Sequence, residues 1–169
     1  MIIKAPPKRT FKGVKKYVSL YNVYDGDTIE IITKLDMFEK NKRYMLRLKG
    51  FDSLELKPKK TLENRKVFIE YAEKIRDILI NLLTPILYVE FEGEDKYGRL
   101  LGTVYNTKVY NFCIYRYKSP YLNINEWILN NKLALPYNGA TKTEYTYDWI
   151  LQNKNNINKI YLTYVNKTN

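Results

Sequence analysis

The chain has 169 residues, 45% of them apolar and 28% charged, which is enough for one domain with its own hydrophobic core. It contains no histidine and a single cysteine, which excludes histidine-based triads, zinc sites built from these residues and a disulfide framework. No apolar run approaches the roughly 18 residues of a membrane span, so we expect no membrane partner. Any chemistry must therefore depend on carboxylates, arginines, lysines and tyrosines.

The net charge of +11 comes from 29 basic and 18 acidic residues. Such a field attracts polyanions, nucleic acid above all, and 17 tyrosines supply aromatic faces on which unpaired bases can stack. The same composition is typical of an AT-rich genome, and basic charge alone can keep a protein soluble, so composition leaves both interpretations open. No secretory signal is visible after the initial MII, and we expect an intracellular protein, a monomer by default.

Residues 1–16 are predicted to form a basic N-terminal arm, because they contain two prolines and no acid. The basic residues of this arm are Lys4, Lys8, Arg9, Lys12, Lys15 and Lys16. Residues 17–169 are predicted to form one domain. Its first two strands are joined by the hairpin signal Asp25-Gly26-Asp27. In all, β-type segments predict strands at residues 17–24, 28–33, 43–49, 86–92 and 100–105.

The longest helix is predicted from Thr61 to Leu83, where apolar residues recur every three or four positions. That stripe consists of Phe68, Ala72, Ile75, Leu79 and Leu82. Residues near Thr61 offer capping, and Pro85 ends the helix. Shorter helices are predicted at residues 125–131 and 145–153. Three strands, a helix, two strands and further helices describe a small α+β domain.

Three segments carry the residue types that phosphodiester cleavage needs. They are Asp25-Gly26-Asp27-Thr28, the stretch from Arg47 to Glu55, and Asp95-Lys96-Tyr97-Gly98-Arg99. A hard cation needs carboxylate and carbonyl oxygens, an attacking water needs a group to orient it, and growing phosphoryl charge needs donors such as arginine. Each segment alone has an ordinary interpretation, as a turn, a surface salt bridge or a hairpin tip. Their combination favours catalysis.

In combination these segments resemble the staphylococcal nuclease family. VYDGDTIEI resembles the first metal hairpin of that family, RLKGFDSLE fits its R-x-x-x-x-D-[TS]-x-E signature, and EDKYGRLLG fits its D-K-Y-G-R-x-L segment. NINEWILNNKLALPY is similar to a later stretch, so the similarity covers residues 18–150 or so. The resemblance implies a five-stranded OB-type β-barrel with about three helices.

The resemblance also implies a calcium site. Asp27 and Asp52 would be carboxylate ligands of Ca²⁺, and the backbone carbonyl of Ser53 would be a third ligand. Asp25 would lie behind them and position the hairpin and the metal-bound waters. Leu54 stands where the family usually has proline, which would loosen the metal loop.

For the chemistry, the resemblance implies that Glu55 acts as general base or orients the attacking water. Arg47 and Arg99 would hold the scissile phosphate, and Tyr97 and Tyr137 would line the nucleotide pocket. The expected activity is hydrolysis of DNA or RNA, as an endo- or exonuclease, leaving 5′-hydroxyl and 3′-phosphate ends.

Two departures from the family leave alternatives open. Gly139 replaces a second pocket tyrosine, which would weaken base stacking. The segment Thr107–Tyr121 resembles an insertion, which could extend the substrate groove, form a lid or a dimer contact, or add a hairpin. The alternative function is a non-catalytic OB-fold module that binds nucleic acid. We favour the enzyme, because all five residues of the implied metal site and chemistry are present: Asp27, Arg47, Asp52, Glu55 and Arg99. A third interpretation, a peripheral membrane protein, has no amphipathic anchor in the sequence to support it.

Overall fold

The computed structural model describes residues 10–35, 37–112, 115–139 and 144–165, with the side chains of 109–112 and 115–118 not described. In chain order the elements are β1 (Lys15–Val23), β2 (Thr28–Thr33), β3 (Lys42–Leu48), β4 (Phe51–Asp52), α1 (Arg65–Leu82), β5 (Ile86–Glu94), β6 (Leu100–Phe112), β7 (Tyr115–Asn123), α2 (Ile124–Asn130), β8 (Leu135–Pro136) and α3 (Tyr147–Tyr164). All five predicted strands are present.

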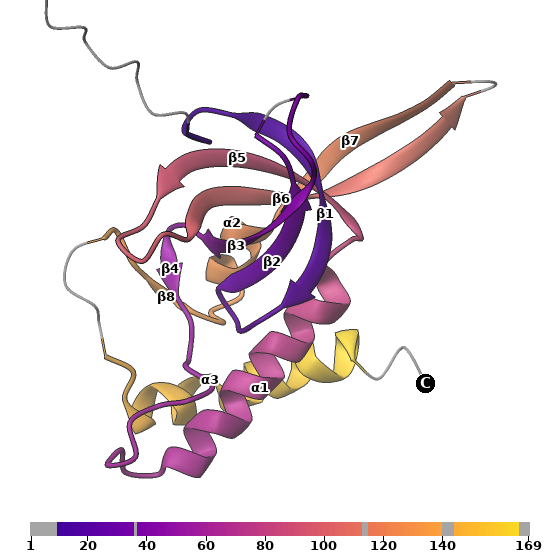
Figure 1. Ribbon diagram of the computed structural model, residues 1–169. Coiled ribbons are helices and arrows are strands. Elements are labelled where there is room, and N and C mark those ends of the chain that lie inside the picture. Colours follow the sequence, from indigo (N-terminus) through magenta and orange to yellow (C-terminus); the bar gives the residue numbers. More distant parts are fainter. Residues whose placement is uncertain (1–9, 36, 113–114, 140–143, 166–169) are drawn as a thin grey trace, which may run out of the picture.

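Strands β1, β2, β3, β5 and β6 close into a barrel (Figure 1). Antiparallel pairing runs in the order β3-β2-β1-β5-β6, and a short parallel pairing of β3 with β6, from Leu46↔Leu100 to Leu48↔Gly102, joins the two ends. Closure removes the unpaired edges that an open sheet would expose. With three helices outside the barrel, this confirms the predicted α+β fold with a five-stranded OB-type barrel.

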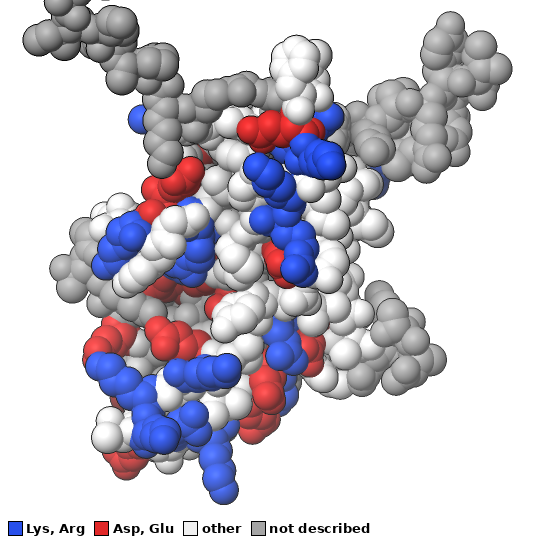
Figure 2. Space-filling model, viewed as in Figure 1, with Lys and Arg blue, Asp and Glu red and all other residues white. Residues whose placement is uncertain are grey.

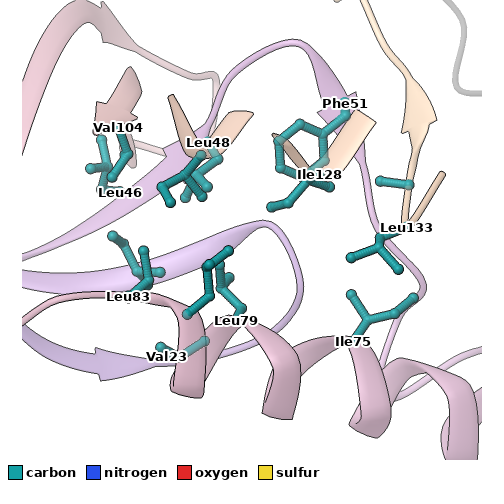
Figure 3. Packing of buried hydrophobic residues seen from close by; sticks show 14 of the residues in the cluster. Val23, Leu46, Leu48, Phe51, Ile75, Leu79, Leu83, Val104, Ile128 and Leu133 are labelled. Atoms are coloured by element: carbon teal, nitrogen blue, oxygen red, sulfur yellow. The ribbon is translucent and has the colours of Figure 1, made fainter. Parts of the chain in front are cut away.

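The core fills the barrel and the layer between the barrel and α1. Alternate residues of the strands point inward, so that Ile29, Ile31, Leu46 and Leu48 are fully buried. Helix α1 lies across one end of the barrel, and Figure 3 shows Ile75 and Leu79 directed from the helix towards it. Every residue of the predicted helical stripe is buried, and burial of each large apolar side chain contributes about 1.5–3 kcal/mol.

Two helix boundaries differ from prediction by more than two residues. Helix α1 begins at Arg65, because Asn64 precedes it with a φ of 55° and no side-chain cap, so Thr61 does not start the helix. Helix α3 extends to Tyr164, eleven residues beyond the predicted end at 153. Ile150 and Ile157 are its buried residues, and the polar asparagines and lysines between them conceal the helical period in the sequence.

The segment predicted as a basic arm joins the barrel within its described part. The buried ring of Phe11 packs 5.1 Å from the ring of Tyr44 and 4.9 Å from that of Phe91. Lys15 lies in β1 and forms an ion pair of 2.9 Å with Glu90. Positions 1–9, which include the predicted arm residues Lys4, Lys8 and Arg9, lie outside the described residues.

The ambiguous segment Thr107–Tyr121 forms a hairpin from the second half of β6 and most of β7, which projects from the barrel (Figure 1). Helix α2 follows it and packs against β6, where the buried side chain of Asn125 spans the seam between β3 and β6. Its Nδ2 atom donates to Lys49 O at 2.8 Å and Gly102 O at 3.2 Å, and its Oδ1 atom accepts from Val104 N at 2.9 Å. None of the helices in the described ranges has the length and apolarity that a membrane crossing requires.

Candidate active site

One pocket of about 1000 Å³ gathers all the predicted site residues. Its walls come from the β1–β2 turn, the end of β3, β4 and the loop after it, the β5–β6 turn and the segment after β8. In Figure 2 this region is a hollow between the barrel and α1, with acidic and basic side chains around it. The predicted residues that line it are Asp25, Asp27, Arg47, Asp52, Ser53, Glu55, Tyr97, Arg99 and Tyr137.

The guanidinium of Arg47 connects the two predicted metal carboxylates. Its Nη1 atom lies 2.7 Å from Asp27 Oδ2, and its Nη2 atom forms an ion pair with Asp52 and donates to Phe51 O at 3.1 Å. Burial alone would lower the pKa of Arg47, but the charges of Asp27 and Asp52 outweigh it and raise that pKa. The two carboxylates therefore converge on a single cation.

A close contact between two turns places Asp27. A Cβ atom on Gly26 would lie 2.0 Å from Ser53 Oγ and 2.9 Å from Ile75 Cγ2, so only glycine fits there. This approach lets the backbone N–H of Ser53 donate to Asp27 Oδ2 at 3.1 Å, while Thr28 Oγ1 donates to Asp27 Oδ1 at 2.8 Å. The glycine of the Asp-Gly-Asp motif thus lets the hairpin turn approach the loop that contains Ser53.

Asp25 lies behind Asp27 and accepts a hydrogen bond from its backbone N–H at 3.1 Å. Burial, and then the negative charge of Asp27, raise the pKa of Asp25 to about 6. Two aspartates thus contact Arg47 and a third lies behind Asp27, and carboxylate oxygens of this kind are the ligands that a hard divalent cation such as Ca²⁺ takes. Within the described ranges, no three acidic or thiol side chains form a metal-binding group, so a calcium site would also require backbone oxygen and water.

The second arginine is held by its own turn. Arg99 Nε donates to Asp95 Oδ2 at 2.7 Å, and Arg99 Nη1 donates to Thr28 Oγ1 at 3.3 Å. Burial would raise the pKa of Asp95, but hydrogen bonds from Arg99 and from the backbone N–H groups of Arg99 and Tyr97 lower it. Gly98, at a φ of 80°, closes the turn as its motif predicts. Through Thr28, Arg99 is coupled to the hydrogen bonds of Asp27.

Each predicted nucleotide-pocket tyrosine lies beside one of the two arginines. The Cζ atom of Arg47 is 5.9 Å from the ring centroid of Tyr137, and that of Arg99 is 5.7 Å from the ring centroid of Tyr97. The Tyr97 side chain is 73% exposed, so its ring is available to a base at the pocket mouth. Glu55 is exposed on the loop after β4, where it lines the same pocket.

Sequence reasoning missed one residue that holds the backbone at Asp52, a predicted metal ligand. The Tyr145 hydroxyl donates to the carbonyl of Asp52 and accepts from the N–H of Leu135 at 2.9 Å, which ties β4 to β8. Burial raises the pKa of Tyr145 and keeps it neutral. Its partners are backbone atoms distant in sequence, so no motif could reveal it. Further pocket residues that were not predicted are Tyr24, Lys49, Lys57 and Lys96.

No protein-family model matches the chain, and no curated protein matches it significantly. Function is therefore inferred from the pocket itself and from the three motifs that line it. The pocket combines carboxylates, two guanidinium groups, exposed aromatic rings and several lysines. That set can bind a phosphate diester, position a water beside it and hold a neighbouring base.

Proposed function

We propose that this protein is a calcium-dependent nuclease, similar to the staphylococcal nuclease family, that hydrolyses phosphodiester bonds of DNA or RNA by attack of water. The observation that carries the proposal is the convergence of Arg47, Arg99, Glu55 and the two aspartates of the calcium site in one pocket. These residues come from segments far apart in the chain, and a merely structural cluster has no need of a second arginine beside a carboxylate-rich cavity. The OB-type barrel and the net charge of +11 also favour a nucleic-acid substrate.

The calcium ion would be held by Asp27, Asp52 and the carbonyl of Ser53. The support for this assignment is that both carboxylates converge on one cation, the Arg47 guanidinium, in a cluster with excess negative charge. When bound, calcium supplies positive charge to the phosphate and orders a water beside it. The proposal requires Arg47 to exchange part of its carboxylate pairing for phosphate oxygens.

The remaining roles follow from the position and chemistry of each side chain. The planar forks of Arg47 and Arg99 bind the non-bridging phosphate oxygens and stabilise the charge that grows on them. Glu55 accepts the proton of the attacking water as its oxygen bonds to phosphorus. The bond to the 5′ oxygen then breaks and that oxygen takes up a proton from solvent water, which leaves a 5′-hydroxyl and a 3′-phosphate. Tyr97 and Tyr137 hold the adjoining nucleotide by stacking.

The second candidate function is a non-catalytic OB-fold module that binds nucleic acid. The pairing of Arg47 with both Asp27 and Asp52 favours it, because a guanidinium can neutralise these carboxylates with no metal at all. In such a module the arginines would contribute affinity and no turnover.

Digestion of end-labelled DNA and RNA oligonucleotides separates the two candidates. Each substrate is incubated with the protein in calcium, in magnesium and in chelator, and the products are resolved on a gel. The nuclease proposal expects cleavage with calcium, none with chelator, and 3′-phosphate ends on the products. Retarded but intact oligonucleotide under all three conditions would establish the binding module instead.

A further inference from the structure

A second cavity lies where the β6–β7 hairpin meets α2, and the proposed chemistry does not use it. Its volume is about 500 Å³, within the 300–1000 Å³ or so that is usual for small-molecule sites. Figure 1 shows β7 leaving the barrel on the side opposite the turn that carries Arg99. The cavity is lined by Tyr105, Pro120, Tyr121, Leu122, Asn123, Glu126, Trp127 and Asn130.

The lining of this cavity suits a flat heterocycle attached to a phosphate. Tyr105, Tyr121 and Trp127 supply aromatic faces, and the Trp127 ring is fixed edge-on by Tyr164 at a centroid distance of 5.5 Å. The Tyr121 side chain is 48% exposed, and Lys108 Nζ lies 4.7 Å from its ring centroid. Aromatic faces stack on bases, side-chain amides and carboxylates read base edges, and an ammonium group binds phosphate. This arrangement favours a nucleotide over a purely apolar ligand.

A row of tyrosines continues from the cavity across the outside of the barrel. Tyr17, Tyr88 and Tyr105 are direct partners on β1, β5 and β6. Their ring centroids are 5.2 Å apart between Tyr17 and Tyr88 and 6.0 Å apart between Tyr88 and Tyr105. Cross-strand aromatic pairs stabilise a sheet, but a row that ends in an aromatic cavity also offers successive stacking surfaces to a strand of bases.

The outer face of β6 connects this cavity to the proposed active site. Leu100 and Val104 point into the core, so Leu101 and Tyr105 lie on the outer face of the same strand. Leu101 lines the active-site pocket and Tyr105 lines the second cavity. The two residues are four positions apart along the strand, about 13 Å, a distance that stacked nucleotides cover in about four steps of 3.4 Å.

We propose that this cavity binds a base of a single-stranded substrate about four nucleotides from the scissile phosphate, with Tyr121 as stacking surface and Lys108 as phosphate contact. The inference rests on the proposed function, because it concerns the path of the same substrate. Bases of a duplex are stacked and paired with each other and cannot enter an aromatic cavity, so the site selects single strands. It extends the binding surface onto the β6–β7 hairpin.

Binding is measured by fluorescence anisotropy in chelator, with a labelled single-stranded octanucleotide and a labelled dinucleotide. The variants are Tyr121→Ala and Lys108→Ala. The matched control is Tyr21→Ala, which removes a ring that is 53% exposed, with Arg43 Cζ 4.9 Å from its centroid, on a different wall of the barrel. Tyr121→Ala should weaken octanucleotide binding roughly 5- to 100-fold, and Lys108→Ala should weaken it by a smaller factor. Neither variant should change dinucleotide binding.

The proposal is overturned if Tyr121→Ala binds the octanucleotide like the wild-type protein, or if Tyr21→Ala loses as much affinity. If the protein has no nuclease activity but Tyr121→Ala still loses octanucleotide affinity, this binding site is supported and the proposed catalysis is not. If the protein cleaves but Tyr121→Ala leaves the octanucleotide Kd unchanged, the proposed catalysis is supported and this binding site is not. Melting temperatures of all three variants show whether each remains folded.

Discussion

Arg47 and Asp27 form an ion pair of 2.7 Å between Nη1 and Oδ2, inside the pocket. Only 12% of the Arg47 side chain and 8% of the Asp27 side chain are exposed, so the pair is shielded from water, unlike the surface pairs that contribute little. Removing one partner of a buried pair leaves the other charge uncompensated. A phosphate that enters the pocket must therefore compete with carboxylates for the same guanidinium fork.

Arg47→Lys should lower kcat on an oligonucleotide by about 10³-fold or more, because lysine keeps the charge but cannot engage two oxygens at once. Arg43→Lys is the matched control, since Arg43 lies on the same strand with its side chain 59% exposed. Single-turnover cleavage gives the rate, and binding of a nucleotide analogue gives the affinity. Comparable rates for wild type and Arg47→Lys would contradict the role of Arg47 in the transition state.

Glu55→Gln should reduce turnover by about 10²- to 10⁴-fold with little change in the affinity for a nucleotide analogue. The substitution keeps the shape of the side chain and removes the group that accepts a proton. Glu63→Gln is the control, since Glu63 is exposed further along the same loop and does not line the pocket. Should affinity fall and turnover persist, Glu55 contributes to binding and is not the base.

The free energy of unfolding of Asp95→Asn should fall less steeply in acid than that of the wild-type protein. The pKa of Asp95 in the folded protein lies below its ordinary value of 3.8, so its contribution is complete above pH 3.8 and is lost as pH falls through the folded pKa. The wild-type advantage over Asp95→Asn should therefore stay constant from neutral pH down to about pH 5 and shrink as the pH falls further. Urea unfolding of both proteins measures it, and an advantage that stays constant would show that the Arg99 pair does not lower this pKa.

Gly26→Ala should destabilise the fold by about 1–3 kcal/mol and lower activity, because its Cβ would overlap Ser53 Oγ and crowd Ile75. Adding Ser53→Gly removes the Ser53 side chain and should recover part of both losses. Thermal unfolding and initial cleavage rates measure the two effects. A fully stable Gly26→Ala protein would show that the two turns do not need to approach this closely.

The strands of the barrel were predictable because one face of each is buried, which imposes alternation on the sequence. The turns that carry the candidate site residues were predictable because glycine and aspartate leave a local signal there. Asp25, Asp27 and Gly98 belong to this class. The function of the gathered residues remains a proposal.

What the sequence did not reveal depends on contacts between distant segments. Tyr145 forms hydrogen bonds with backbone atoms of β4 and β8. Nothing in the sequence around a tyrosine indicates that its hydroxyl has such a role. The spacing of Arg47, Asp27 and Asp52 does not determine that they pair with one another. Likewise, continuous β-type residues in the β6–β7 hairpin gave no alternation from which to locate its turn.

The seam that Asn125 spans also determines when the pocket can form during synthesis. Domains fold from chain that has already been made, and β1 to β3 are made long before their closing partner β6. The hydrogen bonds of Asn125 to Lys49 and Gly102 join chain that is 76 and 23 residues apart. Tyr137, which lines the active-site pocket, is synthesised later still. A nascent chain thus carries Asp27 and Arg47 without an enclosed cavity, which is completed only when the last third of the protein is added.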